Sequence, residues 1–160
     1  MMNRKNNTII ALAVLASSIG HATPMIRQSA FNLQTSKNAE KFLKALAMVE
    51  SSGNAKVKPG DGGRAVGLYQ IHDIYRREAN RILGRQAYRS KDRRDPEKAG
   101  AMVRIVLTHW ARYHARRGRK IGPAELCSLH RQPNGQWRPK RMQTRLERNR
   151  TKKLLKYLEG

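Results

Sequence analysis

The chain has 160 residues, of which 34 are Lys or Arg and 11 are Asp or Glu, and its formal net charge is +23. This length suits one domain, and the 39% of hydrophobic residues can form a small core, so the charge does not make the chain disordered. The sequence contains no large repeats and no multi-pass membrane pattern. Its single cysteine, Cys127, excludes an intramolecular disulfide and a Cys-based metal cluster.

The first 22 residues have the pattern of a secretory signal peptide. Arg4 and Lys5 form a basic region, an apolar run follows from Thr8 to Ile19, and Gly20-His21-Ala22 places small residues at −3 and −1 of a cleavage site. A buried N-terminal helix is the alternative. We predict a signal peptide over 1–22, a tether over 23–34 and the functional domain over 35–160, in a secreted or periplasmic protein.

Export changes which anions the +23 chain is expected to meet. Its charge attracts polyanions in general, and outside the cell these include anionic wall or envelope polymers. Nucleic acid is then expected only as a non-specific polyanion partner.

Apolar periodicity predicts a mainly α domain with little or no sheet. The expected helices are 36–50, 73–83, 96–117, 123–130 and about 140–158, the last one strongly basic. Asp95-Pro96-Glu97 marks one helix start, because Asp is a good N-cap and Pro suits the first helical position. The glycine-rich turn Pro59 to Gly63 and the short apolar segment Gly67 to Ile71 separate the first two helices.

One carboxylate lies on an apolar helix face. Glu50 follows Leu46 by four residues and Ala47 by three, so helical spacing aims its carboxylate along the buried stripe. Burial and the negative end of the helix dipole both favour a protonated carboxyl, which a general acid requires. The position also fits a carboxylate that turns into solvent or pairs with one of the many arginines.

The residues around Glu50 resemble the lysozyme-like superfamily. Glu50-Ser51, with Gly67-Leu68-Tyr69-Gln70 downstream, resembles soluble lytic transglycosylases (SLT domains), whose pattern is a catalytic Glu-Ser followed by Gly-Leu-Met-Gln. The turn Gly60-Asp61-Gly62-Gly63 is similar to bacterial relatives of the invertebrate-type lysozymes. Those proteins carry a second acid at about this distance, followed by Gly-Tyr-Phe-Gln-Ile.

The resemblance extends, more weakly, to the last part of the chain. Glu125 to His130, followed by Pro133-Asn134-Gly135, resembles the invertebrate-type segment in which a His-Asn-Gly-Gly loop precedes a Thr and a Tyr-Trp pair. Here that loop reads His130-Arg131-Gln132-Pro133, Leu154-Leu155 replaces the Tyr-Trp pair, and the usual disulfides are missing. Together the resemblance spans about 39–158 and implies a single lysozyme-like helical domain.

This resemblance implies a muramidase that cleaves the β-1,4 bond between N-acetylmuramic acid and N-acetylglucosamine in peptidoglycan. Glu50 is then the acid that protonates the glycosidic oxygen. Asp61 is the carboxylate that stabilises the oxocarbenium-like cation, attacks it or positions water. The alternative for Asp61 is an ordinary Asp-Gly turn.

Four residues are candidate substrate contacts. Gln70 would hydrogen-bond sugar groups and Tyr69 would stack on a sugar, although Tyr69 also suits the core. His130 and Asn134 are further candidates, although a lone histidine at a helix end is often structural. No cofactor is expected and no metal, because His109, His114 and His130 lack companion acids at ligand spacing.

Two other functions remain open. A lytic transglycosylase needs Glu50 but not Asp61, because the 6-hydroxyl of muramic acid closes an anhydro ring. A non-catalytic basic protein that binds wall polymers, lipopolysaccharide or nucleic acid would instead use the nine Lys or Arg residues between Arg138 and Lys156. Such a binder has no use for an acid on an apolar stripe.

Overall fold

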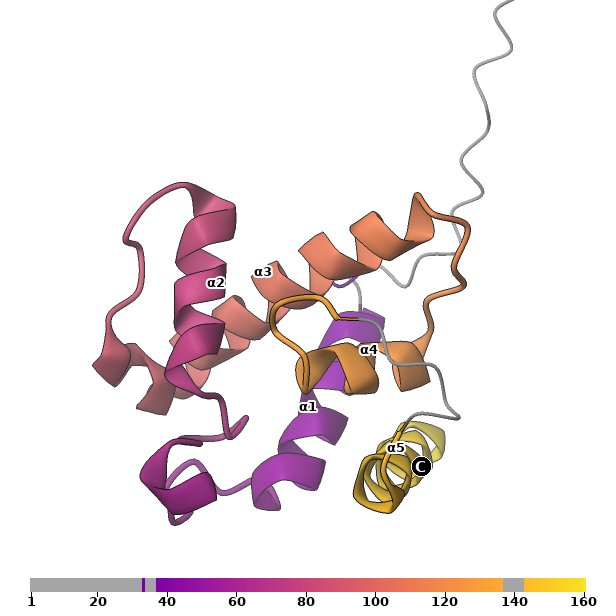
Figure 1. Ribbon diagram of the computed structural model, residues 1–160. Helices are drawn as coiled ribbons and strands as arrows, with labels where there is room; N and C mark the ends of the chain where they lie inside the picture. Colours follow the sequence, from indigo (N-terminus) through magenta and orange to yellow (C-terminus); the bar gives the residue numbers. More distant parts are fainter. Residues whose placement is uncertain (1–32, 34–36, 137–142) are drawn as a thin grey trace, which may run out of the picture.

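The computed structural model describes residues 33, 37–136 and 143–160. In this part of the chain the fold has five α-helices, two short 3-10 helices and no strand (Figure 1). The elements are α1 (Lys37–Ser51), η1 (Asp61–Gly63), α2 (Asp73–Leu83), η2 (Ser90–Arg94), α3 (Pro96–Ala115), α4 (Pro123–His130) and α5 (Arg145–Glu159). The predicted mainly α fold is confirmed.

The helix boundaries follow local signals, with one clear shift. Asp95 caps α3 as predicted, since its Oδ1 accepts hydrogen bonds from the backbone N–H groups of Glu97 at 3.0 Å and Lys98 at 3.1 Å. The last helix begins later than the predicted position near 140. Thr144 is its N-cap, because its Oγ1 accepts from the N–H of Glu147 at 3.2 Å while the Glu147 carboxylate accepts from the Thr144 N–H. Residues 137–142 lie outside the described residues.

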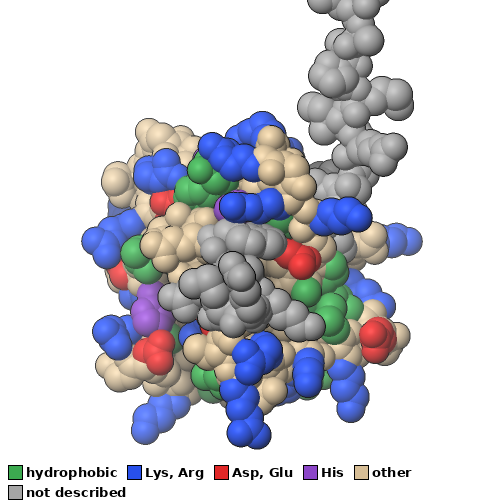
Figure 2. Space-filling view, turned by 45° about the vertical axis from the view of Figure 1, so that its right-hand side comes forward, with side chains coloured by type: hydrophobic (Ala, Val, Ile, Leu, Met, Phe, Trp, Pro, Cys, Tyr) green, Lys and Arg blue, Asp and Glu red, His purple; other side chains and the backbone are tan. Residues whose placement is uncertain are grey.

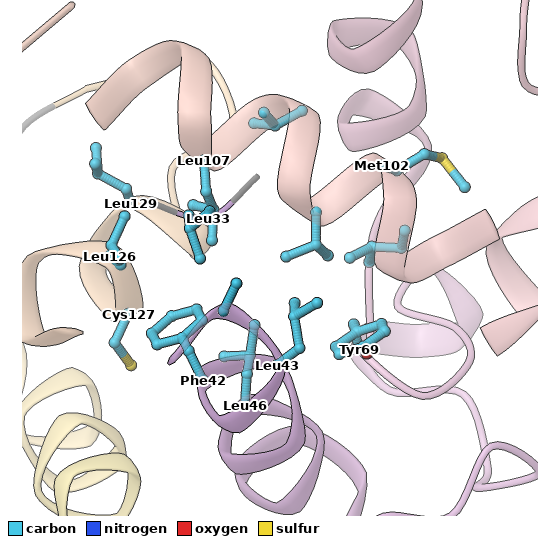
Figure 3. Close-up of a cluster of buried hydrophobic side chains, with 14 of the residues drawn as sticks. Leu33, Phe42, Leu43, Leu46, Tyr69, Met102, Leu107, Leu126, Cys127 and Leu129 are labelled. Atoms are coloured by element: carbon cyan, nitrogen blue, oxygen red, sulfur yellow. The ribbon is translucent and has the colours of Figure 1, made fainter. Parts of the chain in front are cut away.

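The core is built around α1. Its apolar stripe faces α3 and α4, and Phe42 and Leu46 are fully buried (Figure 3). Met102 of α3 and Leu126 of α4 complete this cluster, each also fully buried. Burying side chains of this size supplies the hydrophobic stabilisation that a chain without disulfides depends on.

The position of Leu33 bears on the predicted boundary between the tether, residues 23–34, and the domain, residues 35–160. The sequence placed it in the tether, but Leu33 is only 1% exposed and lies in the core cluster next to Leu107 of α3 (Figure 3). An apolar side chain buried to this extent belongs to the domain. The rest of the predicted tether and the predicted signal peptide lie outside the described residues.

Helix α5 packs against α1 and α4 (Figure 1). Leu154 anchors it and is fully buried, with Leu155 and Leu158 partly buried next to it. Thr151 forms a hydrogen bond with the Cys127 thiol of α4. Within the described residues, no helix combines the length and apolar character needed to cross a membrane.

The segment between α1 and α2 folds into a compact double turn. Gly60 and Ala65 exchange backbone hydrogen bonds of 2.9 and 3.1 Å, and Val66 pairs with Ile71 in the same way. The guanidinium of Arg93, in η2, donates to the backbone oxygens of Arg64 at 3.1 Å and Ile71 at 3.2 Å. The side chain of Arg93 therefore joins η2 to both halves of the double turn.

Candidate active site

Glu50 lies in the last turn of α1, and its side chain is only 1% exposed. Arg150 of α5 donates from Nη1 to both carboxylate oxygens, at 3.3 Å to Oε1 and 3.1 Å to Oε2. The guanidinium of Arg131, just after α4, lies 3.8 Å from Oε2. Glu50 is thus a buried carboxylate that contacts two guanidinium groups from distant parts of the chain.

These two arginines change the interpretation of Glu50. The buried carboxylate is in contact with two cations, so it is not the isolated acid on an apolar face that the helical spacing alone would place there. The sequence offered pairing with an arginine as one alternative, but helical spacing in α1 could not identify Arg131 or Arg150 as the partners. For Glu50 to donate a proton, this contact must open.

His130 is buried beside Glu50 and links three segments. Its Nε2 lies 3.1 Å from the backbone oxygen of Tyr69, and its Nδ1 lies 3.2 Å from the Tyr75 hydroxyl. A neutral ring satisfies both contacts if Nε2–H donates and Nδ1 accepts from Tyr75. Burial lowers the pKa of His130, and the charge of Glu50 acts on the pKa of both His130 and Tyr75. His130 is 4% exposed, and its two contacts join α4 to Tyr75 of α2 and to the backbone at Tyr69; a glycan contact of His130 stays a prediction.

Tyr69 and Gln70 also have structural partners. Tyr69 is 6% exposed in the core cluster, where burial raises its pKa, and it also lines the pocket described below, so stacking on a sugar stays a prediction. The Gln70 side chain closes the double turn: its Oε1 accepts from the Gly60 N–H at 3.1 Å, and its Nε2 donates to the Gly67 oxygen at 3.0 Å. Gln70 is half-buried, and both ends of its amide are engaged within the turn.

Asp61 is an exposed carboxylate at the tip of the double turn. Its side chain is 50% exposed, and its Oδ2 lies 2.9 Å from Nε2 of His72. The hydrogen bond from His72 is the main cause of a lowered pKa, and the charges of Arg131 and Arg64 lower it further. Asp61 therefore remains ionised at neutral pH.

Arg131 connects the two candidate carboxylates. It lies 3.8 Å from Glu50, and its charge also acts on Asp61. The charge of Arg131 thus acts on both carboxylates, and their environments differ, because the Glu50 side chain is buried and that of Asp61 is half exposed. Neither Arg131 nor Arg150 was singled out as a site residue from the sequence, because both stand among many similar arginines.

Asn134 lies in the turn after α4 and is exposed. This turn is attached to α3, where Trp110 Nε1 donates to the Pro133 oxygen at 3.0 Å and His114 Nε2 lies 3.0 Å from the Gly135 oxygen. The Asn134 side chain accepts from the Gln136 N–H at 3.4 Å. These contacts join Asn134 to α3 and not to Glu50 or Asp61, so the structure does not bring it into the same group.

A pocket of about 620 Å³ lies on another side of α1. Glu40, Lys44 and Met48 line it from one face of the helix, together with Tyr69 and Arg104. Glu50 is not among its lining residues, because it projects from the face that contacts α4 and α5. Neither Glu50 nor Asp61 lines the pocket, although Ala47, Ser52 and Gly53, which are close to Glu50 in the chain, do.

The described part of the chain holds no metal-ligand cluster, and the environment of its cysteine thiol is defined by the core. No cluster of three or more His, Cys, Asp or Glu residues there could hold a metal ion. Cys127 is 3% exposed, and burial raises its pKa to about 11, so the thiol stays protonated against Thr151. It behaves as a core residue.

Comparison with known families identifies the fold around Glu50. A family model, the Transglycosylase SLT domain, matches residues 28–114, more than half of the chain. The chain belongs to the Transglycosylase SLT domain family. The lysozyme-like resemblance is thereby confirmed, and this SLT domain is an enzyme that cleaves the glycan strands of peptidoglycan.

The match covers only part of the candidate site. Glu50, Asp61 and the Gly67–Ile71 segment fall inside it, whereas α4 and α5, with Arg131 and Arg150, follow its end. A search of curated proteins and a search of solved structures each found no match. The arginines on Glu50 are thus features of this chain outside the matched region.

The buried histidines predict how the stability of the SLT domain depends on pH. Burial lowers the pKa of His130 and His114, so in the unfolded chain each takes up a proton at a higher pH than in the folded protein. As pH falls through the unfolded histidine pKa of about 6.5, the unfolded state gains protons and the free energy of unfolding decreases. We expect the melting temperature to fall between pH 7.5 and pH 5. His130→Gln, which keeps an uncharged donor and acceptor, should show a shallower dependence; an identical slope in both proteins would contradict this assignment.

Proposed function

We propose that the chain is a lytic transglycosylase in which Glu50 acts first as acid and then as base. Glu50 protonates the glycosidic oxygen as the bond between the two sugars breaks through an oxocarbenium-like transition state. The resulting carboxylate then accepts the proton of the muramic acid 6-hydroxyl, whose oxygen closes onto C1. The products are one strand with an ordinary hydroxyl end and one with an anhydro end.

The observation that carries this proposal is the placement of Glu50-Ser51. The pair ends α1 inside the SLT match, and the Glu50 side chain is withdrawn from solvent, at 1% exposure, beside His130 and Tyr75. A buried carboxyl can exchange one proton with a bound sugar without competition from bulk water. A single acid in that position is sufficient for the transglycosylase reaction.

The muramidase reaction is the second candidate, and Asp61 is the observation that favours it. Its lowered pKa keeps it anionic, and Arg131 lies within electrostatic reach of both carboxylates. A buried acid with a solvated anion is the arrangement that two-carboxylate glycosidases use. In that reaction Asp61 would stabilise the cation, attack it or hold the water.

The basic surface supports an encounter with anionic wall or envelope polymers. Figure 2 shows Lys and Arg side chains around most of the visible face, with few acids between them. Helix α5 adds further exposed cations, among them Arg145, Arg148 and Lys156. Charge of this kind speeds association with a polyanion and binds nucleic acid only non-specifically. Secreted or periplasmic location after cleavage of the predicted signal peptide belongs to the same proposal.

Asp61→Asn separates the two reactions. The substitution removes the charge but keeps the shape of the side chain. We expect cleavage of purified peptidoglycan to remain within about threefold of the parent, because a transglycosylase needs only Glu50. Mass spectrometry of products from the parent should show ends one water lighter than hydrolysed ends. Ordinary reducing ends from the parent, with a loss in Asp61→Asn comparable to that in Glu50→Gln, would instead establish the muramidase.

A further inference from the structure

Arg150 stands between Glu50 and solvent. Its guanidinium contacts both oxygens of a carboxylate that is 1% exposed, while its own side chain is 28% exposed. The side chain of Arg131, the second guanidinium near Glu50, is 30% exposed. A glycan that brings its glycosidic oxygen to Glu50 must therefore displace at least one guanidinium, and Arg150 makes the closer contact.

The free-energy cost of displacing the Arg150 guanidinium depends on whether it finds another anion to pair with. Opening a buried ion pair without a replacement leaves a desolvated charge uncompensated, which is strongly unfavourable. If the arriving substrate supplies a carboxylate, Arg150 exchanges one anion for another in a geometry that a guanidinium forms well. The exchange frees the Glu50 side chain from this contact, so that it can face the glycosidic oxygen.

Position within the fold allows this exchange. Arg150 is carried by α5, which Leu154 anchors to α1 and α4, so its backbone stays in place while the long side chain turns outward. Helix α5 follows the end of the SLT match, so the arginine is additional to the matched catalytic segment. Residues beside it on the same helix, such as Lys152, are exposed and do not contact Glu50.

We infer that Arg150 is a specificity-determining residue: it pairs with Glu50 in the free enzyme and with a carboxylate of the glycan in the complex. This inference rests on the proposed function. The enzyme then favours strands with free carboxylates on their muramic acid substituents over neutral strands of the chitin type. The carboxylate is either that of the stem peptide or, where the peptide has been removed, that of the lactyl group.

Binding measurements test the assignment without requiring turnover. In the Glu50→Gln variant, Arg150 no longer has an anion within the protein to pair with. Adding Arg150→Gln to this variant gives a double variant that lacks the guanidinium, and it leaves no buried carboxylate without its partner because Glu50 has already been replaced. We expect the Glu50→Gln full chain to bind a GlcNAc–MurNAc-tripeptide at least about tenfold more tightly than the double variant, as measured by calorimetry. The same disaccharide with its carboxyl groups amidated should bind both proteins equally. Glu50→Gln combined with Lys152→Gln is the matched control for loss of one α5 cation and should resemble Glu50→Gln.

Cleavage assays then test specificity in the active protein. The ratio of kcat/KM on peptidoglycan to kcat/KM on chitohexaose should fall at least about tenfold in Arg150→Gln and stay unchanged in Lys152→Gln. Peptidoglycan from which the peptides have been removed distinguishes the two carboxylates. If the parent still prefers this substrate over chitohexaose, Arg150 binds the lactyl carboxylate; if the preference is lost, Arg150 binds a carboxylate of the peptide. Equal binding of the tripeptide by Glu50→Gln and the double variant would overturn the role of Arg150. A parent protein that cleaves no glycan would overturn the proposed function instead, and the binding comparison would still decide on Arg150.

Discussion

Replacing Glu50 by Gln is expected to abolish glycan cleavage. Glutamine keeps the size and planarity of the side chain but has no proton to transfer to the glycosidic oxygen. Since general acid catalysis contributes about 10²- to 10⁴-fold, turnover should fall by at least that range in both the transglycosylase and the muramidase reaction. Release of soluble fragments from purified peptidoglycan, identified by mass, measures the effect.

A matched control for this substitution lies on the same helix. Glu40 is an exposed carboxylate in the first turn of α1, and Glu40→Gln makes the same chemical change away from the candidate site. We expect this variant to cleave like the parent. Residual activity of Glu50→Gln near the parental level, in a protein with a parental melting temperature, would exclude Glu50 as the acid. Loss of activity in both variants would indicate a general effect of charge.

The second large effect is expected at Gly67, where alanine should destabilise the domain by about 2–5 kcal/mol. The residue has φ +73, which costs an L-residue free energy, and an added Cβ would overlap the backbone oxygen of Arg93 and lie 3.2 Å from the Cα of Arg94. Both obstacles are backbone atoms of η2, so no side-chain rotation relieves them. The double turn would have to separate from η2. For a domain of this size, such a loss lowers the melting temperature by about 5–15 °C.

Gly62 provides the control for the backbone contribution. Its φ is +63, close to that of Gly67, but a Cβ there meets no atom within 4 Å. Gly62→Ala should therefore show only the cost of the left-handed conformation, about 1–2 kcal/mol. If chemical denaturation gives the same free energy of unfolding for the two variants, the close approach to η2 is not what Gly67 is needed for.

Much of the fold could be predicted because its signals are local. The stripe of α1 and the Asp95-Pro96 start of α3 each depend on residues within one or two helical turns. Backbone geometry repeats over that distance, so spacing in the sequence translates directly into a helix face or a cap. The same reasoning placed Glu50 at the end of α1 and on its buried side, as observed.

The roles of Tyr69 and His130 could not be predicted in this way. Each residue type suits either a glycan contact or the core, and the choice depends on what packs over it. Leu33 shows the same limit, since only its burial in the core cluster distinguishes a core residue from a residue of a tether. The burial of all three residues comes from tertiary packing.

The sequence by itself therefore determined the helices, the catalytic Glu-Ser position proposed here and the strongly basic character of the chain. Only the tertiary structure decided the electrostatic state of the site. Glu50 meets Arg150 across 100 positions of sequence, and Arg131 lies within reach of both Glu50 and Asp61. Among 34 Lys and Arg residues, no local pattern distinguishes these two. The packing of α4 and α5 on α1 selects them, because a charge interaction depends on distance in space and not on separation along the chain.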